Sequence, residues 1–153
     1  MALTLKQRAF AGVWFMAAGL VPVLGISTLL RPIPPTFDSL DFVLWFITFP
    51  LLVIAINGAL FGAGILDPGI VKRGWQAALR GLAVSVVTFL SLSVIFCVWD
   101  AYTNEYTNFI VTLILVLVVG AMSIGWWAVV LGTFAGWLLY QWQVLKQSRR
   151  SSS

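Results

Sequence analysis

Hydrophobic residues occur along this chain in long continuous runs rather than with the spacing of an amphipathic helix or strand. The runs cover residues 9–30, 42–66, 82–99 and 109–140, and short polar segments separate them. An uninterrupted apolar stretch of about 20 residues is the length that an α-helix needs to cross the hydrocarbon core of a bilayer. The pattern therefore predicts a single integral membrane domain over residues 1–153, all-α, built as a four-transmembrane-helix bundle.

The first run follows a sequence that is typical of a helix start. Thr4 and Gln7 have the spacing of a capping box, in which each side chain accepts a hydrogen bond from the backbone of the other residue. A cleaved signal peptide is a competing interpretation. The run continues well beyond the apolar region of such a peptide and ends only at Arg31, which favours an uncleaved span.

The second run carries the residues that most disturb a helix. Pro50 and the glycines Gly58, Gly62 and Gly64 lie within it, so we expect this helix to be bent or locally unwound. Asn57 is the most polar side chain in the interior of any run. An unpaired amide is costly in lipid, so we expect an interhelical hydrogen bond; a polar point in a substrate path is the alternative.

Residues 68–80 break the apolar pattern and predict a short amphipathic helix at the membrane surface, between spans two and three. Apolar side chains recur there at every fourth position, while Lys72, Gln76 and Arg80 form an adjacent stripe. Asp67 is placed to cap the start of this helix.

The last run, residues 109–140, is too long for a simple crossing. As one helix it would measure about 48 Å, against a hydrocarbon core of about 30 Å. We expect one long fourth helix that is tilted, extended beyond the bilayer, or kinked near Gly120 or Gly125. Division into two spans at residues 123–125 is the alternative, and it would move the basic C-terminus to the outer side.

Basic residues indicate the orientation of the chain. Of nine lysines and arginines, all except Arg31 fall on one side of the four-span model. The positive-inside rule then places both termini in the cytoplasm, and we expect a multi-pass protein of the bacterial cytoplasmic (inner) membrane. Residues expected to contact lipid headgroups are Lys72, Arg73, Trp75, Arg80, Lys146, Arg149 and Arg150. This scatter of charges does not indicate nucleic-acid binding.

The residue inventory argues against most catalytic and metal chemistry. The chain has one cysteine, Cys97, and no histidine, and no ionisable residue lies in the interior of a run. We therefore predict no catalytic, cofactor or metal site, and an enzyme is the less favoured interpretation. Four acids, Asp38, Asp41, Asp100 and Glu105, form a small acidic outer face; we favour a solvated surface there over a divalent cation site.

Small residues recur at the spacing of helix-packing faces, notably at Gly58, Gly62, Gly132 and Gly136, and with Asn57 they are the predicted packing residues. Packing within the bundle is the favoured interpretation, and docking of a partner or a second copy is the alternative. Residues 7–12 also resemble residues 76–81, as duplicated hairpins would, although coincidence explains so short a likeness.

These observations favour a protein that works by contact rather than by catalysis. The expected function is an accessory, assembly or stabilising subunit acting through helix–helix contacts, with membrane lipids and a membrane protein or a second copy as partners. The alternative is a small oligomeric permease or channel for a neutral or apolar solute.

Overall fold

The computed structural model describes residues 3–30, 47–67, 69–103, 108–122 and 126–151, and all regular structure in these ranges is helical. Three of the described segments are long and apolar enough to cross a membrane: Phe49–Leu66, Gly74–Thr103 and Trp126–Ser148. The elements are α1 (Leu5–Leu30), α3 (Phe49–Asn57), the π-helical turn η2 (Gly58–Gly62), the 3-10 turn η3 (Ala63–Leu66), α4 (Gly74–Thr103), α5 (Phe109–Gly120) and α6 (Trp126–Ser151).

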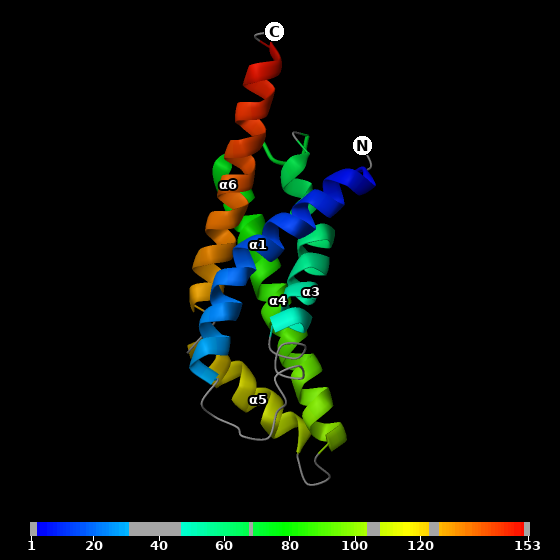
Figure 1. The fold of residues 1–153 in the computed structure, drawn as a ribbon, viewed down its shortest axis with the longest axis vertical. Helices are drawn as coiled ribbons and strands as arrows, with labels where there is room; N and C mark the ends of the chain where they lie inside the picture. The colour runs from blue at the N-terminus through cyan, green and yellow to red at the C-terminus, as the bar shows by residue number, and fades with distance from the viewer. Residues whose placement is uncertain (1–2, 31–46, 68, 104–107, 123–125, 152–153) are drawn as a thin grey trace.

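The long helices run up and down beside one another (Figure 1). Helix α1 leads away from the N-terminus, α3 with η2 and η3 leads back, α4 leads away again, and α6 returns to the C-terminus. Both chain ends therefore lie at one end of the molecule, which we call the terminal end. The opposite end, where α4 finishes and α5 begins, is the distal end.

Two helix starts use the same local device. The backbone N–H of Thr4 donates to Oε1 of Gln7 (2.9 Å), and the N–H of Gln7 donates to the Thr4 hydroxyl (3.3 Å), so the predicted capping box is present. At the start of α4, Oε1 of Gln76 accepts from the N–H groups of Lys72 (2.9 Å) and Arg73 (3.3 Å). Both glutamines thus satisfy amides that have no partner within the helix.

The region between η3 and α4 differs from the prediction of a separate interfacial helix at 68–80. Asp67 caps only a turn, in which the N–H of Gly69 donates to its Oδ1 (2.8 Å). Helix α4 begins at Gly74 and continues without interruption, so residues 74–80 are its first two turns. The amphipathic pattern is explained by one helix whose start is partly exposed at the terminal end.

The last apolar run does not form a single helix. Helix α5 ends at Gly120, and α6 begins at Trp126. With 12 residues, α5 measures about 18 Å, too short to cross a bilayer, and it lies obliquely to α4 and α6 at the distal end (Figure 1). The chain nevertheless returns once to the terminal end, so the break redirects the run without adding a second full crossing.

The second run loses α-helical geometry where its glycines lie. Helix α3 passes into η2 at Gly58 and into η3 at Ala63. The predicted local unwinding is therefore seen in the second half of this segment. Pro50, by contrast, lies in the first turn of α3, where its missing N–H needs no helical partner.

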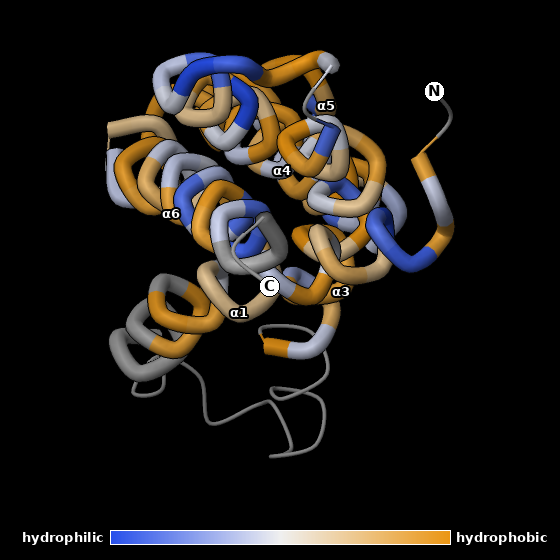
Figure 2. Tube along the Cα trace, turned by 90° about the horizontal axis from the view of Figure 1, so that it is seen from above, coloured by the Kyte–Doolittle hydropathy of each residue, from blue (hydrophilic) through white to orange (hydrophobic). Residues whose placement is uncertain are grey.

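A cluster of buried hydrophobic side chains lies toward the terminal end. Figure 2 shows hydrophobic residues along every helix, and many large ones are exposed. Outward-facing apolar side chains on every helix are expected of a protein surrounded by lipid. The cluster consists of Ala11, Phe15, Ala63, Ile65, Leu66, Val71, Ala77, Val84, Ala135 and Leu139.

Candidate functional site

Helices α4 and α6 cross at the predicted small-residue face. A Cβ atom added to Gly136 would lie 2.5 Å from the carbonyl oxygen of Ala77 and 2.9 Å from Cα of Gly81. A Cβ atom added to Gly132 would clash with the Ser85 hydroxyl and lie 2.9 Å from the Gly81 carbonyl oxygen. The backbones approach too closely for any side chain, so these glycines are occupied within the chain.

Helix α1 crosses the second run in a similar way. A Cβ atom at Gly58 would lie 2.8 Å from Cβ of Phe15, and one at Gly62 would overlap the Phe15 ring. Asn57, beside these glycines, is only 7% exposed. No hydrogen bond of its side chain to another described residue is observed, so the expected interhelical bond stays a prediction.

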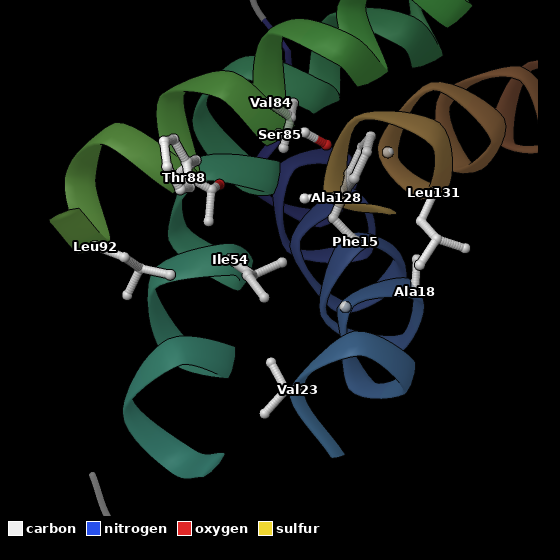
Figure 3. A pocket seen from close by; sticks show the side chains of 13 residues that line it. Phe15, Ala18, Val23, Ile54, Val84, Ser85, Thr88, Leu92, Ala128 and Leu131 are labelled. Atoms are coloured by element: carbon white, nitrogen blue, oxygen red, sulfur yellow. The ribbon is translucent and has the colours of Figure 1, made fainter. Parts of the chain in front are cut away.

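Helices α1, α3, α4 and α6 line a partly open apolar cavity of about 130 Å³ (Figure 3). Phe15 and Val23 reach it from α1, and Ile54 from α3. Its remaining walls are α4 and the first turns of α6, and Figure 3 shows Leu92 and Leu131 on these sides. This volume suits a molecule of a few heavy atoms.

Thr88 is the polar exception in the wall of this cavity. Ser85, Ser93 and Thr133 each donate a hydroxyl hydrogen bond to the carbonyl four residues earlier. The Thr88 hydroxyl is buried and has no such partner among the described residues. It projects from α4 beside the cavity (Figure 3), and its oxygen is enclosed by neighbouring atoms.

A larger apolar groove lies where α5 and α6 meet α4, and we call it the junction groove. Its volume is about 410 Å³, and its walls include Val86, Phe89 and Leu90 of α4. Met122 and Trp126 line its other side and are 76% and 69% exposed. Large aromatic and methionine side chains are enriched in the buried centres of protein interfaces.

The residues expected at lipid headgroups fall into two groups at the terminal end. Lys72, Arg73 and Trp75 are exposed around the start of α4. Arg80 is only partly exposed, and its guanidinium group lies against Gly64 at the end of the second run. Lys146 is exposed on α6, and the side chains of Arg149 and Arg150 lie outside what the structure describes.

The acidic outer face is mostly outside the described residues, since Asp38, Asp41 and Glu105 are not among them. Within the described ranges no group of three or more acidic, cysteine or histidine side chains could hold a metal ion. Cys97 is fully buried in α4.

Sequence reasoning missed both the cavity at Thr88 and the junction groove. The sequence showed Thr88 only as one of several hydroxyl residues in span three, because the difference lies in which of them bonds back to its own helix. In the sequence, Met122 and Trp126 belong to a continuous apolar run. A kink near Gly120 was predicted, but the groove forms only because α5 turns away from the axis of α6.

Comparisons of this chain with protein-family models, with curated proteins and with solved structures find no match.

Proposed function

We propose that this protein is an accessory or stabilising subunit in a membrane, and that it holds a transmembrane helix of its partner in the junction groove. The observation that carries the proposal is the exposure of Met122 and Trp126 beside an apolar groove of about 410 Å³. Side chains of this kind contribute most to binding when a partner removes them from solvent or lipid.

The small-residue faces support this choice of surface because helices of the same chain already cover them. Gly132 and Gly136 contact α4, and Gly58 and Gly62 contact α1, so none of the four is available to a partner. The junction groove is a concave apolar surface of the described chain that can take side chains of another helix.

The same proposal includes a membrane orientation. Four passes, with both termini in the cytoplasm of a bacterium, agree with the bias of basic residues and with the position of both chain ends at the terminal end (Figure 1). The three long apolar segments among the described residues support residence in a membrane.

Site-specific crosslinking tests the partner proposal. A photoreactive phenylalanine analogue replaces Met122 in the groove, and the control places it at Val13, which is 59% exposed on α1 and does not line the groove. We expect one discrete protein adduct from position 122 and lipid adducts alone from position 13. Lipid adducts alone from both positions would contradict the proposal, and an adduct with a second copy of the chain would identify the partner as the protein itself.

A small permease for a neutral or apolar solute is the second candidate, and the Thr88 cavity is the observation that favours it. In this function Ser85 and Thr88 would be the polar residues along an otherwise apolar path. Purified protein in liposomes should then move small alcohols or similar solutes, and Thr88→Val should slow their movement. Absence of such movement in protein that still crosslinks its partner would leave only the subunit proposal.

A further inference from the structure

A third pocket lies at the terminal end, between the first turns of α1 and the last third of α6. Its volume is about 420 Å³. Two of its lining residues, Phe10 and Trp142, have their rings stacked against each other, with centroids 4.7 Å apart. Buried Leu66 also lines the pocket, and its carbonyl oxygen accepts a hydrogen bond from Nε2 of Gln143 (2.9 Å). We call this the basic pocket.

The charge of the basic pocket is entirely positive. Lys6 enters from α1 and Lys146 from α6, and the other polar lining residues are the neutral glutamines Gln7, Gln143 and Gln147. The lining contains no aspartate or glutamate. Neither lysine forms a salt bridge within the described part of the chain, so both charges are available to an external anion.

Lys146 is held in position by its neighbour. Its Nζ atom lies 4.8 Å from the ring centroid of Trp142, a cation–π contact. Trp142 is itself fixed by the stack on Phe10, so the ammonium group is directed by the packing of α1 against α6. A positioned cation loses less conformational entropy on binding than a free surface lysine does.

The arrangement of the pocket matches an amphipathic anion better than a soluble ion. The lining combines cations and amide groups with aromatic and aliphatic carbon. A phosphodiester with a polar headgroup above and a glycerol backbone below presents the same two surfaces. Trp137, Tyr140 and Trp142 lie along this part of α6, and aromatic residues of this kind gather at the level of lipid headgroups.

We propose that the basic pocket binds the headgroup of an anionic phospholipid, such as phosphatidylglycerol, in the leaflet at the terminal end. Lys6 and Lys146 contact the phosphate, and Phe10 and Trp142 contact the glycerol and the first acyl carbons. The site is separate from the junction groove, so it does not depend on partner docking.

Native mass spectrometry of the detergent-purified chain measures this binding directly. Phosphatidylglycerol and phosphatidylcholine are added to the wild type, to a Lys6→Gln/Lys146→Gln variant, and to an Arg8→Gln control, which removes an exposed positive charge near the start of α1 that does not line the pocket. We expect the wild type and the control to retain phosphatidylglycerol in preference to phosphatidylcholine. The pocket variant should bind phosphatidylglycerol about tenfold or more weakly.

Two further measurements distinguish a defined site from general attraction. A Lys6→Arg/Lys146→Arg variant keeps both charges and should retain the preference for phosphatidylglycerol, and its loss together with normal folding would contradict the site. Millimolar inorganic phosphate should not displace the lipid. Displacement by phosphate, equal loss in both glutamine variants, or equal binding of the two lipids would each overturn the proposal.

Discussion

At the scale of single residues, the buried hydroxyl groups in this chain differ in whether they form a hydrogen bond to the backbone of their own helix. Ser85, Ser93 and Thr133 bond back to the preceding turn, whereas the Thr88 hydroxyl is buried beside an apolar cavity and has no partner among the described residues. A buried hydroxyl without a partner costs about 1–3 kcal/mol. The Thr88 hydroxyl therefore lowers the stability of the folded chain.

Replacing Thr88 by valine should stabilise the protein, because the substitution removes the unpaired oxygen and keeps the shape of the side chain. We expect a gain of about 1 kcal/mol in the free energy of unfolding, measured by equilibrium unfolding in mixed micelles. The control is Thr133→Val, which removes a satisfied hydroxyl and should cost about 0.5 kcal/mol. Destabilisation by Thr88→Val would show that this hydroxyl is already bonded.

Gly132 is the residue at which a single methyl group should be most damaging. A Cβ atom there would meet both the Ser85 side chain and the Gly81 backbone, and backbone cannot move aside cheaply. Gly132→Ala should lower the free energy of unfolding by about 2 kcal/mol. Val130→Ala, at an exposed site on the same helix, should change it by less than about 1 kcal/mol, and similar losses in both variants would contradict the close crossing.

At the scale of elements, the start of α1 and the apolar segments could be predicted because their causes are local, whereas the start of α4 at Gly74 was not predicted. The Thr4–Gln7 box, the apolar runs and the glycine-rich half of the second run are each a property of neighbouring residues. The break between α5 and α6 and the continuity of α4 through residue 80 could not be chosen from sequence, since both depend on packing. The basic pocket was missed for the same reason: Lys6 and Lys146 lie far apart in the chain and meet only in the fold.

The likeness of residues 7–12 to 76–81 has a structural counterpart in each segment. Gln7 and Gln76 both cap a helix start, and Gly12 and Gly81, five residues later, both lie at close helix crossings. A Cβ atom at Gly12 would lie 2.7 Å from the carbonyl oxygen of Ala55, and one at Gly81 would clash with the backbone of Gly132. The shared pattern is a cap followed by a crossing, and this combination is common enough to arise twice independently.

Removal of the cap at α4 provides a test of this device. Gln76→Leu should free the N–H groups of Lys72 and Arg73, so both amides should exchange hydrogen faster and the free energy of unfolding should fall by about 1 kcal/mol. Gln76→Glu keeps an acceptor at the same position and should preserve slow exchange. Equal exchange in all three proteins would show that the cap contributes nothing.

At the scale of the whole molecule, the position of both chain ends at the terminal end predicts how the protein is exposed to each compartment. In a Cys97→Ala background, cysteines replace Thr4 and Ser148 at the terminal end and Tyr102, 84% exposed, at the distal end. A membrane-impermeant maleimide should label position 102 in intact cells. Positions 4 and 148 should react only after permeabilisation, and labelling of just one of these two in intact cells would contradict the arrangement.

The distribution of buried side chains gives α5 different mechanical properties from the crossing of α4 and α6. The glycine crossing at Gly81, Gly132 and Gly136 is close-packed, while α5 at the distal end has no buried residue. Helix α5 can therefore shift without breaking this crossing. We therefore expect the protein to adapt to bilayers of different hydrophobic thickness by changing its width and tilt at one leaflet, while its cross-section in the other leaflet stays constant.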